Sequence, residues 1–242
     1  MKNIFFSFLT VGVFSVLCGC TNVARFDYSS AQGGFVNAAP AGRSNKVLAV
    51  LPYGDMRAAY HSLPESGSFY WGLLPLMPFG PVFKPEPEKS SDFISLGYYH
   101  FDPDNDLQRA AAMSFTQSGL FGKVVAVESL EEARSINADY VWCGKVENTT
   151  YKGFMLTYCI TYFLAPVLWT AGAPEGVSIN ELAVSGQLFD ASGNLVFFNR
   201  AEESEWLMHW IYARVGGDCR NYPVLMKKIM NKTIAEMSSI SL

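Results

Sequence analysis

The chain has 242 residues, 50% of them hydrophobic, and its formal net charge is −4. This apolar content is ample for a folded core, and the length suits one domain with insertions better than two domains. A mildly acidic chain without a basic block is a poor nucleic-acid binder, so the composition argues against that class of partner.

Residues 1–19 predict a signal peptide of the lipoprotein type. A basic N-terminus precedes an apolar run over residues 4–17, which is too short for a membrane span, because a spanning helix needs about 20 apolar residues. Leu17 and Gly19 stand where a bacterial lipobox has an aliphatic and a small residue before its cysteine. We therefore expect cleavage between Gly19 and Cys20, and lipidation of Cys20.

Two alternatives to the lipobox stay open: an ordinary cleaved signal, and a metal-binding pair of Cys18 with Cys20. The residue after Cys20 is Thr21, and in resembling systems an Asp at that place retains the protein at the inner membrane. The sequence therefore favours an outer-membrane anchor made by the acylated Cys20, with the domain facing the periplasm. Exposure of the domain at the cell surface is the alternative.

After the anchor, residues 20–45 are rich in Gly, Ala, Ser and Asn and have little periodicity, which predicts a flexible tether. A single domain is expected over 46–242, and its first element is a buried strand at Val47–Leu51. Residues 61–105 then predict a long apolar loop, because their proline density suits neither a helix nor a central strand. The aromatic content of this insertion argues against disorder, and long ordered loops are usually functional.

Regular elements follow this insertion. We expect a helix that is capped by Asn105 or Asp106 and closed by Gly119 or Gly122, then a strand at 123–127 and a helix at 129–138 with Ser129 and Glu132 in capping-box spacing. A strand at 139–153 follows, then a hairpin at 179–203 with its turn at 192–194, and a last helix at 222–237 with Leu225, Ile229 and Ile234 along one side. The order is β-α-β-α-β-β-β-α, which predicts an α/β (α+β) domain with a small mixed sheet.

A second insertion is expected at 154–178, where residues 154–173 carry no charge. Length alone makes this stretch a candidate membrane span. Alternation of apolar and polar residues from Leu156 to Tyr162, and the helix-breaking Pro166, argue against a span. A strand or helical turn folded against the domain is the favoured interpretation, followed by an interfacial or partner-binding segment.

Several stretches resemble known envelope proteins. They are Lys46–Pro52, Ser118–Phe121 before Lys123–Val125, Ala138–Val141 leading to Gly144–Val146, and Leu188–Gly193. Together with the lipobox they are similar to bacterial outer-membrane lipoproteins and to the small α/β domain of TolB-type periplasmic proteins. The resemblance covers about half of the mature chain and implies an envelope location and a small α/β fold.

No motif indicates catalysis or a cofactor. Asp102, Asp104 and Asp106 alternate as at the start of a calcium loop, but Leu107 and Met113 stand where that loop needs Gly and Glu. Helix capping is therefore the favoured role of these aspartates.

The remaining histidines and cysteines show no site pattern either. The three histidines, His61, His100 and His209, lie far apart without a triad or zinc signature. Any two of Cys143, Cys159 and Cys219 could form a disulfide in an oxidising compartment, and the sequence does not choose a pair. We expect no enzyme, no cofactor and no metal.

The two insertions are the remaining candidates for function. In a parallel α/β arrangement the ends of neighbouring strands lie together, so the insertions can meet at one end of the sheet. The predicted interaction surface comprises Trp71, Leu74, Phe79, Phe83, Tyr162 and Trp169. We expect this surface to bind an envelope protein or lipid. A subunit of an oligomeric envelope or secretion assembly is the alternative. An envelope hydrolase is the third and least favoured hypothesis, because no nucleophile–base pair is evident in the sequence.

Overall fold

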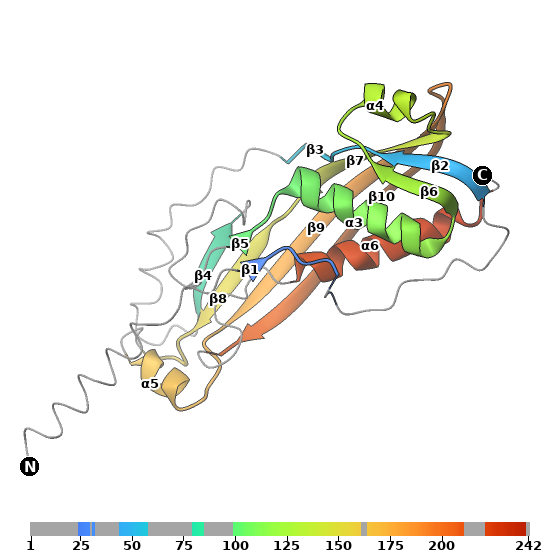
Figure 1. Ribbon diagram of the computed structural model, residues 1–242. Coiled ribbons are helices and arrows are strands. Elements are labelled where there is room, and N and C mark those ends of the chain that lie inside the picture. Colours follow the sequence, from blue (N-terminus) through green and yellow to red (C-terminus); the bar gives the residue numbers. More distant parts are fainter. Residues whose placement is uncertain are drawn as a thin grey trace, which may run out of the picture.

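The computed structural model describes residues 24–29, 31, 44–57, 79–84, 99–160, 164–210 and 221–240, with the backbone alone for 24, 44 and 79–84. The strands are β1 Ala24–Arg25, β2 Ser44–Val50, β3 Gly54–Asp55, β4 Phe79–Lys84, β5 Tyr99–His100, β6 Phe121–Ala126, β7 Tyr140–Asn148, β8 Tyr151–Leu156, β9 Gly176–Asp190 and β10 Leu195–His209. The helices are α3 Pro103–Ser118, α4 Leu130–Ser135, α5 Ala165–Thr170 and α6 Tyr222–Met237. The mixed α/β fold class is confirmed (Figure 1).

The main sheet has eight strands, and the long strand β9 is its central strand. One side of β9 pairs antiparallel with β7 along its C-terminal half and with β8 along its N-terminal half, and the other side pairs with β10. Beyond β7 lie β2 and β6, all three parallel to one another. Beyond β8 lies β4, antiparallel to it. One end of the sheet is therefore built from β6, β2, β7, β9 and β10, and the other end from β4, β8, β9 and β10.

The core lies between the sheet and two helices, α3 and α6, which lie side by side on one face (Figure 1). It includes the fully buried side chains Leu48, Leu107, Leu182, Leu188 and Leu225. The small helix α4 covers the opposite face at the β2–β6 corner, where Ala133 packs with Ala49 and Val127. Farther along the sheet, no described helix covers that opposite face, which is the open face of the sheet.

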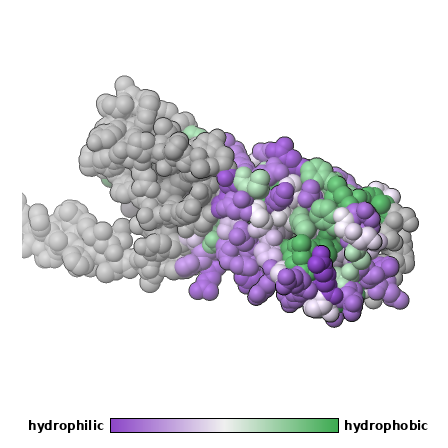
Figure 2. Space-filling model, turned by 90° about the horizontal axis from the view of Figure 1, so that it is seen from above, coloured by the Kyte–Doolittle hydropathy of each residue, from purple (hydrophilic) through white to green (hydrophobic). Residues whose placement is uncertain are grey.

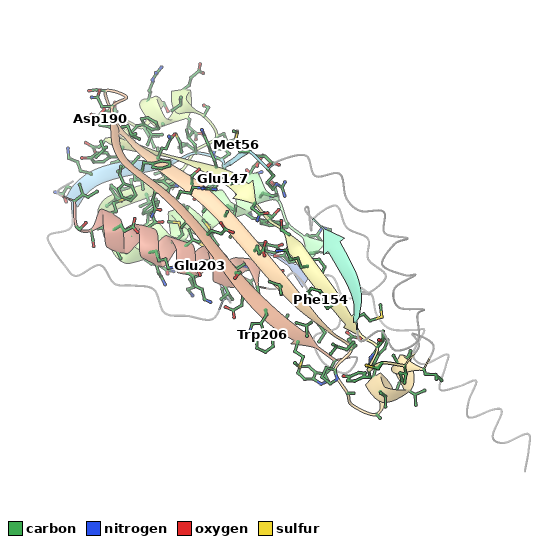
Figure 3. The ribbon with its side chains drawn as sticks, turned by 180° about the vertical axis from the view of Figure 1, so that it is seen from behind. Met56, Glu147, Phe154, Asp190, Glu203 and Trp206 are labelled. Carbon is green, nitrogen blue, oxygen red and sulfur yellow. The ribbon has the colours of Figure 1, made fainter. Side chains whose placement is uncertain are left out.

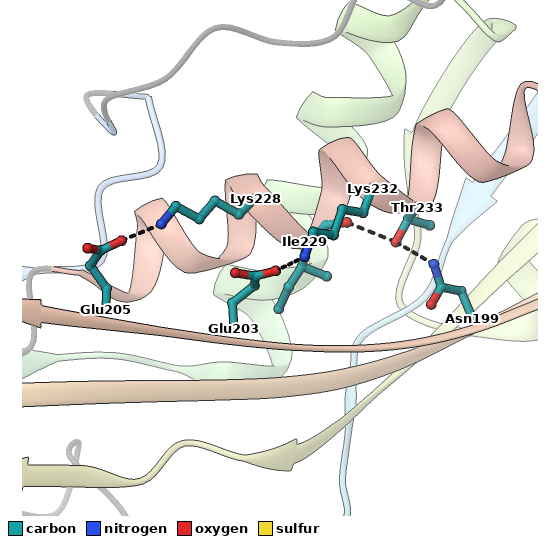
Figure 4. A network of polar contacts seen from close by, with 7 residues as sticks. All are labelled: Asn199, Glu203, Glu205, Lys228, Ile229, Lys232 and Thr233. Atoms are coloured by element: carbon teal, nitrogen blue, oxygen red, sulfur yellow. Dashed lines mark hydrogen bonds and ion pairs between the residues drawn. The ribbon is translucent and has the colours of Figure 1, made fainter.

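Polar contacts fix α6 above β10 (Figure 4). Lys228 pairs with Glu205, Lys232 pairs with Glu203, and Asn199 Nδ2 donates to Thr233 Oγ1 at 3.3 Å. The exposed ion pairs contribute little stability, about 0–1 kcal/mol each. Their use is to set the position of α6 along the strand, while Leu225, Met226, Ile229 and Ile234 supply the burial.

Several predicted elements are confirmed and one boundary is corrected. Helix α6 has the predicted bounds, and Ser129 Oγ accepts the Glu132 N–H at 3.2 Å as the capping-box spacing predicts. Helix α3 begins at Pro103 with Asp102 in the N-cap position, rather than after a cap at Asn105 or Asp106. Proline suits the first helical position because its φ is already helical and its missing N–H needs no partner there.

The strand predicted over 139–153 is wrong as a single element, because it is divided into β7 and β8. Asn148 Oδ1 accepts the Thr150 N–H at 2.9 Å, which turns the chain locally. The Thr150 carbonyl still accepts the Glu181 N–H at 2.8 Å, so both strands stay on the same side of β9. The break therefore lets one continuous stretch serve both ends of the sheet.

Residues 24–29 are packed on the domain, which corrects the prediction of a flexible tether for this part. β1 pairs in parallel with β5, and the Phe26 ring stacks on Phe101 with centroids 5.1 Å apart. Tyr28 is 5% exposed, and Lys227 Nζ donates to the Ala31 carbonyl at 2.9 Å. Phe26 and Tyr28 alternate, so both rings face the core although the surrounding composition is polar.

Part of the predicted proline-rich loop is also a strand. β4 includes Pro81 and lies at the edge of the sheet, next to β8. An edge strand tolerates proline because one of its sides needs no ladder hydrogen bonds. The argument from proline density therefore excluded a central strand but not an edge strand.

Candidate interaction surface

The two apolar insertions are neighbours in the sheet. β4 comes from the first and β8 opens the second, with Phe79 opposite Leu156 and Lys84 opposite Tyr151. After Leu156 the chain turns into α5 and returns through Pro174 to β9. The segment predicted as a candidate span is therefore divided between a strand and a short helix, and no helix among the described residues is long and apolar enough to cross a membrane.

Helix α5 is held to the end of β8 by its single aromatic side chain, Trp169. Trp169 Nε1 donates to the Leu156 carbonyl at 3.0 Å, and Ala165 is fully buried. Tyr158 Oη donates to the Pro174 carbonyl at 2.6 Å across the base of the loop. Tyr158 and Cys159 have φ of 54° and 62°, a left-handed conformation that non-glycine residues rarely adopt. Such strained backbone is concentrated at functional segments.

The opposite side of α5 is an exposed apolar face. Leu164, Val167 and Leu168 are 56%, 64% and 37% exposed. Their i, i+3, i+4 spacing places them together on one side of the helical turn, away from Trp169. A helix that served only the core would turn these residues inward. We call Leu164, Val167 and Leu168 the α5 face.

A second apolar group lies on the open face of the sheet, at the same end as α5 (Figure 3). Cross-strand neighbours form two rows, Phe154–Val177–Met208 and Lys152–Ile179–Trp206; four of the five apolar residues are partly buried and Trp206 is 61% exposed. We call these five residues the sheet patch. Charged pairs adjoin the sheet patch: Lys152, beside Ile179, pairs with Glu181 at 2.5 Å, and farther from α5 Arg200 pairs with Glu147 at 2.5 Å.

Exposed apolar side chains elsewhere are scattered. On the side where α4 lies, hydrophobic and hydrophilic residues are mixed (Figure 2). The other large exposed apolar side chains are Met56, Met113, Leu130, Leu195, Phe198 and Ile240, and of these only Leu195 and Phe198 share an element, β10. Single exposed apolar residues are normal, whereas a cluster at one end of the molecule indicates contact.

Glu175 is the first acidic residue after the uncharged loop, and it sits between the ends of three strands. Its N–H donates to the His209 carbonyl at 2.9 Å, and its carbonyl accepts the Leu156 N–H at 2.9 Å. Burial raises the pKa of the Glu175 carboxyl to about 7. Among the described residues no cation forms an ion pair with it, so nothing offsets the loss of water.

Glu175→Gln is expected to reduce the pH dependence of stability. In the wild type the raised folded pKa destabilises the fold above about pH 7, and this penalty is lost as the pH falls toward the unfolded pKa near 4.5. Discounted for partial exposure, the effect is about 1–2 kcal/mol. Urea unfolding at pH 5 and pH 8 measures it, and an equal pH dependence in both proteins would contradict the assignment.

The structure also contains a hydroxyl–imidazole pair that sequence reasoning missed. Ser178 Oγ and His209 Nε2 lie 2.7 Å apart on neighbouring strands. Ser178 is fully buried and His209 is 2% exposed. The sequence indicated no nucleophile–base pair, but the fold brings a hydroxyl and an imidazole within hydrogen-bond distance here. The two partners are 31 positions apart in the sequence and gave no local signal, because only the β9–β10 register brings them together.

The predicted surface residues fare differently. Trp71, Leu74 and Tyr162 lie outside the described residues, and for Phe79 and Phe83 only the backbone of β4 is described. Trp169 belongs to α5 but points toward β8. The exposed residues that sequence reasoning missed are Leu164, Val167, Leu168 and Trp206. The i, i+3, i+4 spacing of the first three was a signal for a shared helix face, but Pro166 had argued against a helix in this segment.

The other candidate residues stay apart. His100 is exposed in β5, and His61 lies outside the described residues. In the described ranges no three His, Cys, Asp or Glu side chains gather into a metal site, Asp102, Asp104 and Asp106 included. Cys143 and Cys159 are free thiols, whereas Cys18, Cys20 and Cys219 fall outside the described part of the chain.

Comparison with known proteins assigns no family. No family model matches the chain, and no curated protein matches it either. Among solved structures it is similar to the PelC dodecamer from Paraburkholderia phytofirmans, at 17% identity and a TM-score of 0.35, over 81% of this chain and 91% of that one.

Two lipoproteins are also similar to it. Lipoprotein GNA1162 from Neisseria meningitidis is 11% identical with a TM-score of 0.28, over 81% of this chain and 99% of that one. A minor lipoprotein from Acinetobacter baumannii is 8% identical with a TM-score of 0.29, over 81% and 94%. These scores are too low to transfer a function, and the TolB-type resemblance stays a prediction.

Proposed function

We propose that this protein is a non-enzymatic lipoprotein of the bacterial envelope, anchored at the outer membrane through acylated Cys20, that binds a partner with its α5 end. The observation that carries the proposal is the orientation of α5. The Trp169 side chain attaches this helix to β8, while Leu164, Val167 and Leu168 are exposed on its other side. Apolar side chains exposed together on a fixed element favour contact with another molecule.

The anchor itself rests on the sequence around Cys20, and the packing of residues 24–29 is compatible with it. Because Phe26 and Tyr28 hold this stretch to the domain, few residues separate the domain from the acyl chains. Lipid chains at about 0.8 kcal/mol per buried CH₂ supply the membrane affinity, so the fold needs no spanning element.

The α5 face provides the main test of the proposal. Changing Leu164, Val167 and Leu168 together to Ser is expected to abolish complementation of a deletion strain. The free energy of unfolding should change by less than about 1 kcal/mol, because these side chains are already exposed. The matched control changes Met113, Leu130 and Leu195 to Ser, which are 36%, 52% and 53% exposed on other elements. Full complementation by the α5 variant would contradict the proposal.

A non-enzymatic role predicts that the buried hydroxyl–imidazole pair is dispensable for activity. Ser178→Ala is expected to leave cellular function intact, because a fully buried hydroxyl cannot reach an envelope substrate. The lost hydrogen bond costs about 1–3 kcal/mol, so abundance and melting temperature are measured in parallel. Loss of function at unchanged abundance would favour the envelope hydrolase instead.

One observation favours a second candidate, a structural subunit of an envelope assembly. β10 pairs with β9 over its whole length, and no described strand pairs with its other side. A long edge strand is a template for pairing with another chain, and Phe198 and Trp206 are 55% and 61% exposed along it. A defined oligomer in detergent that Trp206→Glu dissociates would favour this candidate.

A further inference from the structure

We propose that the partner of the α5 face is the lipid bilayer itself, and that the domain stands on its own membrane by its α5 end. This inference rests on the lipidation of Cys20 in the proposed function. It adds that the domain has a fixed orientation, with Leu164, Val167 and Leu168 in the lipid–water interface.

The connection between Cys20 and the folded domain is short. Ala24 is fixed to the fold because β1 pairs with β5 and Phe26 stacks on Phe101. Four residue steps separate Cys20 from Ala24. A fully extended chain of this length spans at most about 14 Å. The acyl chains, and hence the bilayer, must come within that distance of β1.

Contacts through Tyr99 and Tyr222 fix the height of β1 along the sheet. Tyr99 of β5 packs on Tyr222 with ring centroids 6.1 Å apart, and Tyr222 Oη donates to the Thr149 carbonyl at 2.6 Å. β1 therefore lies near the start of β8. From Tyr151 to Leu156 that strand covers about 17 Å at ~3.3 Å per residue, and α5 lies beyond it.

The two lengths select one end of the molecule. The reach of the connection is comparable with the distance to α5, so a bilayer at the limit of that reach meets the α5 end. The Glu181 N–H donates to the Thr150 carbonyl, so Glu181 marks the level of the start of β8 on β9. The opposite end of the sheet, at the Asp190 turn, lies about 30 Å from Glu181 along β9, which exceeds the length of the Cys20–Ala24 connection. A bilayer held within that reach on this side would have to take up the end of the sheet with the charged Asp190 carboxylate, which is costly.

A third arrangement would lay the helical layer flat on the bilayer. That side presents the ion pairs Lys228–Glu205 and Lys232–Glu203, together with Arg109 of α3. Charged side chains in a bilayer interior are costly. The α5 end is the better surface, because no charged residue occurs between Lys152 and Glu175.

The chemistry of the α5 end suits a lipid–water interface. A short helix with one apolar face can lie in the plane of the interface, where its backbone ends stay near water. Tyr158, 37% exposed, stands next to α5 with its hydroxyl bound to Pro174, and aromatic residues of this kind favour the headgroup level. Burial already favours the neutral form of Glu175, so its approach to the headgroups costs less than that of an ordinary carboxylate.

The test uses the full mature chain, lipidated at Cys20, with Cys143, Cys159 and Cys219 changed to Ser. Val167→Cys carries an environment-sensitive dye, and the protein is placed in vesicles of phosphatidylethanolamine and phosphatidylglycerol containing nitroxide-labelled lipid. Met113→Cys on α3 and Leu195→Cys at the far end carry the same dye as controls. Flotation of the vesicles reports the lipid anchor separately.

We expect the dye at position 167 to be quenched and the dyes at positions 113 and 195 to stay in water. Adding Leu164→Ser and Leu168→Ser should remove the quenching while the protein still floats, which shows that the dye alone does not drive insertion. A protein that floats with position 167 in water overturns the inference and leaves the anchor standing. Quenching at position 113 instead overturns it in favour of the flat arrangement. Failure to float overturns both the anchor and the inference.

Discussion

Gly186→Ala is expected to lower the free energy of unfolding by about 3 kcal/mol or more. A methyl group at position 186 would lie 2.0 Å from Cζ2 and 2.3 Å from Cη2 of Trp142. The indole cannot move aside, because it is 2% exposed, donates from Nε1 to Tyr53 Oη at 3.2 Å and meets the Phe115 ring edge-on. The sheet therefore needs glycine at this position to admit the largest buried side chain of the core.

The control for this prediction is another glycine on a strand. A methyl group at Gly54 would find its nearest atom at 3.9 Å, so Gly54→Ala should be nearly neutral. Gly144→Ala should resemble Gly186→Ala, since its methyl would lie 2.3 Å from the Tyr53 ring. Urea unfolding measures all three. A loss below about 1 kcal/mol for Gly186→Ala would show that the core repacks around the added methyl.

The elements that the sequence predicted well are those whose signals are local. The helix from Tyr222 to Met237 was predicted from Pro223 at its start and from Leu225, Ile229 and Ile234 along one side. These three apolar side chains are buried in the fold. The β9–β10 hairpin was predicted from the alternation of apolar and small or polar residues and from the turn residues 192–194. In the fold Gly193 has a φ of 85°, which suits glycine. Local signals of this kind survive in the fold because packing and propensity agree.

The errors come from residues whose state is decided by distant partners. Phe26 and Tyr28 lie in a polar stretch, and only Phe101 and Ser114, far along the chain, show that they are core residues. Pro81 made 79–84 look unfit for a strand, and only the position at the edge of β8 permits it. Strand register likewise brings Ser178 to His209, which no spacing in the sequence predicts.

The two insertions meet where the sequence predicted, while five of the six predicted surface residues have no described side chain and stay predictions. Sequence reasoning expected the two insertions to meet at one end of the sheet, and β4 and β8 do pair there. It chose Trp169 because aromatic residues often dominate contacts. In the fold this tryptophan attaches α5 to β8, while the aliphatic Leu164, Val167 and Leu168 are exposed. Aromatic residues are strong anchors for a core as well as for an interface, so identity alone could not separate the two roles.

Cys20→Ala is expected to remove the protein from the outer membrane altogether. Without the thiol no acyl chain can be attached, and the lipoprotein signal should stay uncleaved, leaving an unprocessed precursor. The α5 face cannot replace the anchor. Burying one apolar side chain completely is worth about 1.5–3 kcal/mol, and three partly exposed ones give only a few kcal/mol. Two or more acyl chains contribute much more, at about 0.8 kcal/mol for every buried CH₂.

The matched control for this prediction is Cys18→Ala, because this cysteine, two residues before Cys20, should leave with the signal peptide. Gel mobility, labelling with a palmitate analogue and fractionation of the envelope follow both variants. Cys18→Ala should mature, take up the label and sediment with the outer membrane like the wild type. Cys20→Ala should do none of these. If Cys20→Ala matures normally and fractionates with the outer membrane, the lipobox interpretation is wrong, and the orientation argued from the short Cys20–Ala24 connection is lost with it.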